Sequence, residues 1–187
     1  MSDSLITKRA IAEALKQVCK GKPFDKISIS DITAVCGLNR QTFYYHFQDK
    51  YELLSWIYYN ENFAFIAEDI SLENWNEKFF ELLENMKKER SFYMNTLKEQ
   101  QHTFEGYMYE MAKALFIDAI CALDENNKLT EEERDFDAAF YAYGICGIIM
   151  DWAENGMRMD STLLAKRLNR LAWATERIGY IRSQVDL

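Results

Sequence analysis

Apolar side chains recur along most of the chain at intervals of three and four residues, which is the spacing of one face of an α-helix. In the first segment the apolar positions are Ile6, Ala10, Ile11, Ala14, Leu15 and Val18. They predict an amphipathic helix that ends at the Gly-Lys-Pro sequence of residues 21–23. Because no strand-like alternation or internal repeat interrupts this spacing, the pattern predicts an all-α protein of about nine helices.

Capping sequences mark where the next helices begin. Ser28 and Asp31 form a capping box for a second helix of about two turns, which Gly37 closes. Asn39 is the expected N-cap of a third helix over about residues 40–47. A further capping sequence follows directly and opens a longer fourth helix, which extends to about residue 67. Three short helices therefore precede a longer one.

The remainder of the chain keeps the helical spacing. The expected helices cover about residues 71–86, 92–100, 104–123, 131–154 and 161–182. Ser91 is the expected cap of the short second one, and Thr130 with Glu133 forms a capping box for the fourth. We expect these helices to pack together as a bundle.

The two short helices joined by a glycine turn, at about residues 28–47, are typical of the helix-turn-helix, whose second helix enters the DNA major groove. At about 100° per residue, one arc of that helix carries Arg40, Gln41, Tyr44 and Tyr45, and Phe43 lies opposite them. Arginine can donate two hydrogen bonds to guanine, and glutamine can pair with adenine. The residues alone also leave open a packed aromatic cluster with a solvated arginine beside it.

The distribution of charge agrees with a DNA-binding N-terminus. The whole chain has a formal net charge of −8. Residues 1–50 hold eight Lys or Arg and five Asp or Glu, a net charge of +3, and residues 51–187 hold fourteen and twenty-five, a net charge of −11. A small basic module on an acidic body is one expected form of a DNA-binding protein, although chance variation of surface charge gives similar counts.

The segment 7–56 also contains an ordered set of residues. They are Phe24 before the second helix, the Ser28 cap, Asp31-Ile32, Gly37, the run Thr-Phe-Tyr-Tyr-His-Phe at 42–47, and Lys50 followed by Glu52-Leu53-Leu54. This set resembles the N-terminal domain of TetR-family transcription regulators. The sequence departs from the family pattern at Gln41, where a small residue is frequent, and before Phe24, where a glycine is usual. Residues 40–58 also resemble a narrower branch of the family, the activators of dihydroxyacetone-kinase operons.

The resemblance implies roles for particular residues. It assigns base or backbone contacts with DNA to Arg40, Gln41, Thr42 and Tyr45. It assigns phosphate contacts to Ser28, Tyr44, His46 and Lys50. It further implies that the C-terminal helices enclose a ligand cavity and that the last two long helices pair with those of a second copy in a four-helix dimer interface.

Aromatic residues, a methionine and a histidine in the helical body are candidates for lining that cavity, because mostly apolar small molecules bind to such surfaces. They are Trp56, Tyr59, Phe63, His102, Tyr107, Met111 and Trp152. At helical spacing such residues are more often part of a plain hydrophobic core than of a ligand cavity.

The dimer interface is expected on helices 131–154 and 161–182, since DNA half-sites are usually read by two-fold dimers. One face of the last helix carries leucines and a threonine, and the preceding helix offers small side chains to receive it, which suits close helix packing either within the chain or across a dimer. The two sets are Leu164, Leu168, Leu171 and Thr175, and Ala138, Ala142 and Gly144.

Catalytic chemistry finds no support in the sequence. G-x-S-x-G, HExxH, Walker and glycine-rich dinucleotide motifs are absent, and two distant histidines form no metal site. The four cysteines are widely spaced and are expected as small buried side chains in a reducing compartment. No segment has the length and apolarity of a signal peptide or a membrane span. We therefore expect a cytoplasmic protein that is not an enzyme and needs no cofactor.

The function predicted from these observations is a TetR-type transcription regulator that binds double-stranded operator DNA as a homodimer. Residues 1–48 are the expected helix-turn-helix domain. Residues 49–187 are the expected helical domain for dimerisation and for binding an unknown small-molecule effector or co-regulator protein. The alternative is a helical interaction protein whose body docks another protein, with little DNA reading of its own.

Overall fold

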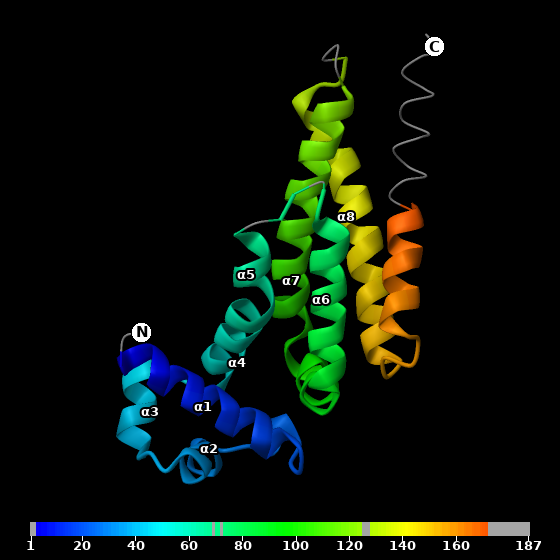
Figure 1. The fold of residues 1–187 in the computed structure, drawn as a ribbon. Coiled ribbons are helices and arrows are strands. Elements are labelled where there is room, and N and C mark those ends of the chain that lie inside the picture. Colours follow the sequence, from blue (N-terminus) through cyan, green and yellow to red (C-terminus); the bar gives the residue numbers. More distant parts are fainter. Residues whose placement is uncertain (1–2, 69, 72, 125–127, 172–187) are drawn as a thin grey trace. The chain divides into compact units, whose positions relative to one another are not determined.

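The computed structural model describes residues 3–68, 70–71, 73–124 and 128–171, which form helices joined by turns and short loops (Figure 1). No β-strand occurs in these ranges, so the predicted all-α class is confirmed. The α-helices are α1 (Asp3–Cys19), α2 (Ile29–Cys36), α3 (Arg40–His46), α4 (Lys50–Tyr58), α5 (Ala64–Ala67), α6 (Trp75–Lys88), α7 (Arg90–Leu123) and α8 (Glu131–Glu154). Two short helices of other types are η1 (Phe24–Lys26), a 3-10 helix, and η2 (Tyr59–Phe63), a π-helix. A further helix covers residues 161–171, and its predicted continuation to 182 lies outside the described residues.

Three predictions of helix boundaries differ from the structure. The helix expected from about residue 71 begins at Trp75, as α6. The helices expected at 92–100 and 104–123 are one continuous helix, α7. Ser91 is not its cap but lies in its first turn, because the N–H groups of Phe92 and Tyr93 already donate to the carbonyl oxygen of Glu89. The expected fourth helix is interrupted, since the π-turn of η2 separates α4 from α5.

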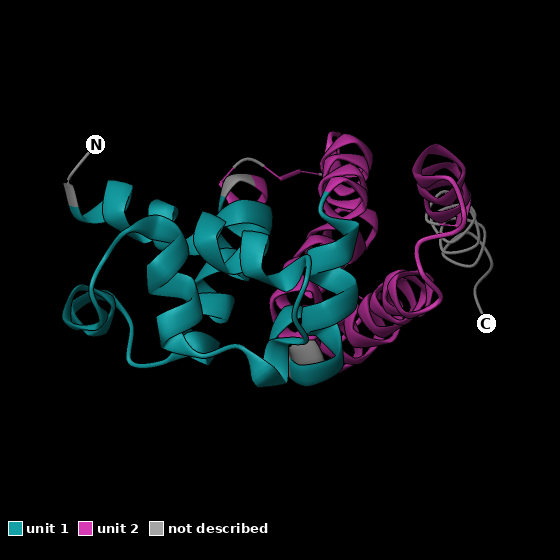
Figure 2. Cartoon of the chain, turned by 90° about the horizontal axis from the view of Figure 1, so that it is seen from below, with its two compact units in different colours: residues 1–65, 89–104 teal, residues 66–88, 105–187 magenta. Residues whose placement is uncertain are grey.

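The chain divides into two compact units (Figure 2). Unit 1 holds residues 1–65 and 89–104, and unit 2 holds residues 66–88 and 105–187. Helix α7 therefore contributes its first part to unit 1 and the remainder to unit 2. The domain boundary expected after residue 48 stays a prediction, and the compact unit that contains residues 1–48 is larger than that segment.

The N-terminal part of unit 1 is three helices around one apolar core. Ile11 and Leu15 of α1, Ile32 of α2 and Phe43 of α3 are completely buried. Burying side chains of this size stabilises a fold by about 1.5–3 kcal/mol each. Helices of eight and seven residues, as α2 and α3 are, do not persist alone in water. The shared core is therefore what holds α2 and α3 in place.

Unit 1 also contains a buried polar network between the end of α4 and the start of α7. The Tyr58 hydroxyl donates to Thr96 Oγ1 at 2.8 Å, and the Tyr93 hydroxyl donates to Asn62 Oδ1 at 2.9 Å. All four residues are almost completely buried, and burial raises the pKa of both tyrosines. Because buried polar groups must be paired, this network fixes the start of α7 against the α4–η2 segment.

Unit 2 is made of helices that run side by side, namely α6, the remainder of α7, α8 and the helix at 161–171 (Figure 1). Every one of them contributes to its core. Examples are Leu82, Met108, Ala142 and Leu164, none of which is more than 3% exposed.

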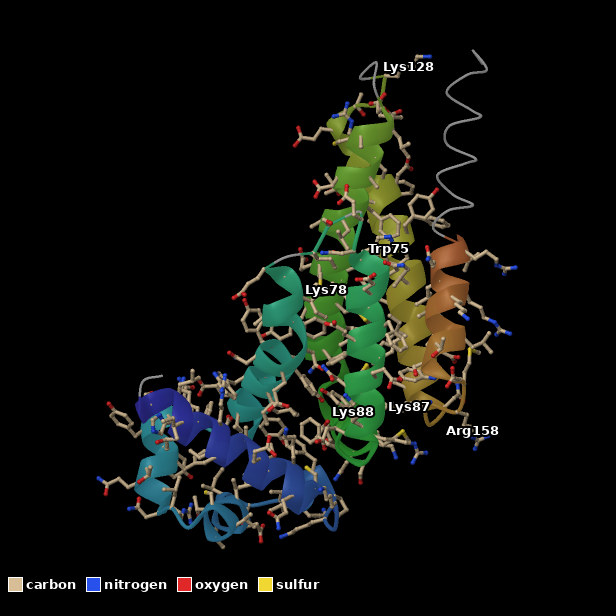
Figure 3. All side chains as sticks on the ribbon, in the orientation of Figure 1. Trp75, Lys78, Lys87, Lys88, Lys128 and Arg158 are labelled. Carbon is tan, nitrogen blue, oxygen red and sulfur yellow. The ribbon has the colours of Figure 1, made fainter. Side chains whose placement is uncertain are left out.

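The loop between α8 and the last helix is held where it enters the last helix. Trp152 Nε1 donates to the carbonyl oxygen of Met159 at 2.9 Å. Lys87 of α6 lies 3.5 Å from Asp160, and Figure 3 shows Lys87 and Arg158 at the same end of the unit. These contacts fix the reversal of the chain that brings the last helix back along α8.

The remaining expectations concern cysteines, metals and membranes. All four cysteines are free thiols; Cys19 and Cys146 are buried as expected, but Cys36 is half-buried and Cys121 is exposed. Within the described part of the chain, no group of three or more His, Cys, Asp or Glu side chains is placed to hold a metal ion. None of the described helices is long and apolar enough to cross a membrane.

Candidate DNA-binding interface

Helix α2 begins with the capping box expected at Ser28 and Asp31. The Asp31 N–H donates to Ser28 Oγ at 3.2 Å, and the Ser28 N–H donates to Asp31 Oδ2 at 2.7 Å. Lys22 Nζ lies 2.7 Å from the same carboxylate oxygen. The hydrogen bonds from Lys22 and Ser28 hold the pKa of the Asp31 carboxyl far below its ordinary value. The predicted start of the helix-turn-helix is confirmed.

The turn between α2 and α3 is also as predicted. Gly37 has a φ of 67°, a left-handed conformation in which a residue with a Cβ is strained. The N–H of Leu38 donates to the carbonyl oxygen of Thr33 and closes α2. Asn39 Oδ1 then accepts from the N–H of Thr42 at 2.8 Å, which caps α3.

Helix α3 presents four side chains away from the core. Tyr45 is 84% exposed and Tyr44 is 50% exposed, and Arg40 and Gln41 are exposed as well. Phe43, on the opposite side of the helix, is completely buried. Arg40 Nη2 donates to the Tyr44 hydroxyl at 3.3 Å, so these two side chains meet on the surface. The outward arc therefore offers guanidinium, amide and phenol groups suited to base edges and phosphates.

Three other residues with implied DNA contacts lie at the edge of this arc. Ser28 is exposed, but its hydroxyl donates to Asp31 Oδ2 at 2.7 Å. Thr42 is half-buried, and its hydroxyl donates to Asn39 Oδ1 at 3.1 Å. His46 is half-buried. The two hydroxyls therefore serve the helix caps and have only acceptor capacity left for DNA.

Lys50 is placed differently from what the resemblance implies. Its Nζ donates to three backbone carbonyl oxygens, those of Phe24 at 2.7 Å, Asp25 at 3.0 Å and Ile27 at 3.0 Å. An ammonium group has three N–H donors, so all of them are engaged within the chain. Burial lowers the pKa of Lys50. This geometry does not support a direct phosphate contact by Lys50.

The seven candidates for an effector pocket are divided between the units. Unit 1 holds Trp56, Tyr59, Phe63 and His102, and unit 2 holds Tyr107, Met111 and Trp152. Phe63 and Trp152 are 2% and 5% exposed and pack as core residues. Tyr59 and His102 are exposed. Neither unit by itself gathers the set, and the pocket stays a prediction.

A cavity that the sequence did not suggest lies on unit 2 between α8 and the helix at 161–171. Its volume is about 560 Å³. Its lining is apolar with three basic side chains: Ile148, Met159, Leu164, Leu168, Leu171, Lys166, Arg167 and Arg170. None of the seven pocket candidates lines this cavity.

Most of the residues predicted for a dimer interface instead pack within the chain. Ala138 and Ala142 are completely buried, and Leu164 and Leu168 are 3% and 2% exposed. Small residues let α8 approach its neighbours closely, which is why this face is turned inward. Leu171 and Gly144 are exposed, and Thr175 lies outside the described residues.

A second, outward face of α8 carries exposed aromatic rings. Phe136, Phe140 and Tyr143 are 72%, 69% and 67% exposed. They recur at intervals of four and three residues, so they form one line along the helix, which we call the α8 aromatic stripe. Three large aromatic side chains in a line on a surface are typical of a protein–protein interface.

Comparison with known proteins agrees with this fold. The family pattern described as bacterial regulatory proteins of the tetR family matches residues 8–56. The pattern described as a transcriptional regulator C-terminal region matches residues 73–173. The chain therefore belongs to the TetR family of DNA-binding transcription regulators, a family that is not enzymatic.

The relatives include one that also confirms the narrower resemblance. The chain is 29% identical to the HTH-type dhaKLM operon transcriptional activator DhaS of Lactococcus lactis subsp. lactis (strain IL1403). The matched region of 163 residues covers 86% of each of the two chains. The solved structure of dihydroxyacetone kinase operon activator DhaS has a TM-score of 0.75 at 26% identity, covering 93% of this chain and 98% of its own. NalD, the secondary repressor of the MexAB-OprM multidrug efflux pump in Pseudomonas aeruginosa, shares the fold, with a TM-score of 0.63 at 19% identity over 92% of this chain and 96% of its own.

Proposed function

We propose that this regulator binds operator DNA as a homodimer in the cytoplasm, with α3 of each copy in a major groove. The observation that carries the proposal is the outward arc of α3, anchored from behind by the buried Phe43. Arg40 and Gln41 supply the donor and acceptor groups that distinguish guanine and adenine. Helix α3 has seven residues and reaches few base pairs, so a second copy must read a second half-site.

The remaining contacts are proposed from position. Tyr44 and Tyr45 project from the exposed arc, so their hydroxyls can reach phosphates or base edges. Ser28, Thr42 and His46 flank the arc and are proposed to lie against the sugar–phosphate backbone, whose oxygens only accept. His46 can donate from its ring, whereas the Ser28 and Thr42 hydroxyls would first have to turn away from Asp31 and Asn39. Such contacts position α3 in the groove, and they do not determine which base sequence it recognises.

The α8 aromatic stripe is the proposed dimer interface. In a two-fold dimer the same surface of each copy meets its equivalent, so the two stripes together supply six aromatic rings to the contact. The rings are exposed in a single chain because the second copy is proposed to cover them. Covering them removes their apolar surface from water. The helix at 161–171 lies beside α8 and has exposed leucines of its own, Leu163 and Leu171, which are 43% and 50% exposed.

Regulation is proposed to act through unit 2, by an effector molecule or a co-regulator protein. DhaS is named as an activator of the dhaKLM operon. By likeness to it, the first DNA to test is the region upstream of this protein's own gene and of any dihydroxyacetone-kinase operon in the same genome. An interaction protein with little DNA reading is the rival function, which the α8 aromatic stripe would also serve.

A gel-shift titration with these upstream fragments separates the two functions. A DNA-reading regulator should bind one fragment more tightly than random DNA, and its affinity should fall steeply as salt increases, because phosphate contacts release counterions. Absence of binding to every fragment at low salt would favour the interaction protein instead.

Replacing Arg40 with Ala should weaken binding to the preferred operator by about 1–3 kcal/mol and relax the preference at one base position. The guanidinium is exposed on α3 and is the strongest candidate for a guanine contact. Competition titrations with single-base operator variants measure both effects. Lys20→Ala is the matched control, since it removes the same charge from an exposed position outside α3. Equal losses on operator and random DNA for Arg40→Ala would show that α3 does not read sequence.

A further inference from the structure

The connection between α1 and α2, residues 19–27, depends on a side chain from α7. Asn95 Nδ2 donates to the carbonyl oxygens of Cys19 at 3.0 Å and Lys22 at 2.8 Å, and Asn95 Oδ1 accepts from the N–H of Phe24 at 2.9 Å. Cys19 is the last residue of α1, so the asparagine satisfies one of the carbonyls that a helix end leaves unpaired. If the side-chain amide of Asn95 were turned by 180°, its N–H donors would face the N–H of Phe24 and its oxygen would face two carbonyl oxygens. The partners therefore determine which way the amide points.

Lys50 holds the second half of the same connection. Its ammonium donates to the carbonyl oxygens of Phe24, Asp25 and Ile27, as described above. The same Nζ lies 4.8 Å from the centre of the Phe24 ring and 5.5 Å from that of Tyr51. Two aromatic rings and three carbonyl oxygens therefore surround this cation. The three carbonyl groups belong to residues 23–26 positions earlier in the chain.

Six hydrogen bonds with two side chains, five donated and one accepted by them, thus fix a nine-residue connection. After Cys19, the last residue of α1, its only regular structure is the short helix η1. The connection ends directly before Ser28, the N-cap of α2. Helix α2 packs on both α1 and α3. Together with the shared core, the conformation of residues 19–27 therefore sets where α2 begins on α1, and α2 in turn supports α3.

We propose that Asn95 and Lys50 are positioning residues for DNA recognition, which act by holding the α1–α2 connection and not by contacting DNA. This inference rests on the proposed function. It makes the start of α7 a part of the DNA-reading unit, although α7 follows the matched N-terminal region of residues 8–56 by more than thirty positions. It also replaces the phosphate contact of Lys50 with a role inside the protein.

The test uses the full chain with Asn95→Leu, Lys50→Met and the control Lys98→Met. Lys98 is exposed on α7, so its replacement removes a charge from the same helix without touching the connection. An operator is first selected from random duplex DNA with the wild-type protein. Affinities for that operator and for random DNA of equal length are then measured across a salt series, at a temperature where circular dichroism shows every variant folded.

Asn95→Leu and Lys50→Met should each lower the ratio of operator affinity to random-DNA affinity by about tenfold. This is the effect of losing one side chain–base contact, which is expected when α3 is no longer held in register. Their salt dependence on random DNA should equal that of the wild type and of Lys98→Met. If Lys50 is instead a phosphate ligand, Lys50→Met weakens both DNAs alike and lowers the salt slope by about 0.9. An unchanged affinity ratio in folded Asn95→Leu would reduce Asn95 to a purely structural role. Either result overturns the proposal for that residue.

Amide hydrogen exchange tests, without DNA, whether Asn95 holds the α1–α2 connection in place. In Asn95→Leu the Phe24 N–H, which loses its acceptor, should exchange about tenfold faster, while amides of α8 keep their wild-type rates. Unchanged exchange at Phe24 would refute the hold by Asn95. If Asn95→Leu does not fold, Asn95→Asp replaces it, because the carboxylate keeps an acceptor for Phe24 but cannot donate to the two carbonyls. A wild-type protein that selects no operator would defeat the proposed function, while the exchange result still decides whether the hold exists.

Discussion

Replacing Phe43 with Ala should lower the free energy of unfolding of unit 1 by about 3–5 kcal/mol. The ring is completely buried, with the Phe47 ring centre 5.9 Å away and the Tyr44 ring centre 5.6 Å away. Its removal leaves a cavity in the core that α1, α2 and α3 share and takes away the largest contact of α3 with that core. Helix α3 should therefore lose its fixed position, and operator binding should be lost with it.

Tyr45→Ala is the matched control on the same helix. It removes a ring of similar size that is 84% exposed, so the free energy of unfolding should change by less than about 0.5 kcal/mol. Urea unfolding followed by circular dichroism measures both variants, and a gel shift measures both DNA affinities. Tyr45→Ala should bind DNA less tightly while remaining as stable as the wild type. Similar stability losses for the two variants would mean that α3 is not oriented as described.

The local parts of this site were predictable because their hydrogen bonds join residues close in sequence. Ser28 and Asp31, like Thr130 and Glu133, are three positions apart and cap a helix whatever the rest of the chain does. The left-handed Gly37 is predictable for the same reason, since a glycine between two short helical patterns has few other uses. The outward arc of α3 then follows from helix geometry and one buried anchor.

The contacts that hold the α1–α2 connection could not be predicted in this way. Asn95 bonds to backbone groups 71–76 positions away, and nothing in the neighbouring residues distinguishes it from a surface asparagine. Lys50 was found by its place in a family pattern, but the pattern does not say whether its ammonium faces a phosphate or three carbonyls. Side chains that bond to the backbone of distant segments carry no sequence periodicity, so only the fold reveals them.

The two faces of α8 show a different limit. Its inward and outward faces both carry apolar side chains, and the sequence left open whether the small residues Ala138 and Ala142 pack within the chain or against a second copy. The structure buries these two within unit 2 and leaves Phe136 and Phe140 exposed. When a helix has two apolar faces, the face that packs against its own chain is decided by how closely the neighbouring helices must approach it. Small side chains allow the closer approach, and the large rings are then left for a partner.

Replacing Phe140 with Glu should weaken the homodimer on the order of 100-fold or more. Phe140 lies in the middle of the α8 aromatic stripe and is 69% exposed in the single chain. In a two-fold dimer the change occurs twice, so the interface loses two rings and gains two carboxylates with no partner charge. Each copy should still fold, because the core of unit 2 does not contain this side chain.

Sedimentation equilibrium over a range of protein concentrations measures the dimer dissociation constant, and gel shifts measure operator affinity in parallel. Operator binding should fall with dimerisation, since each half-site contact alone is too small to hold one copy. Leu123→Glu is the control, because it makes the same chemical change at a side chain of unit 2 that is 41% exposed and outside the stripe. Circular dichroism should show wild-type helix content for both variants. A Phe140→Glu protein that remains dimeric at concentrations where the wild type is dimeric would place the interface elsewhere and leave the stripe as a surface for a different partner.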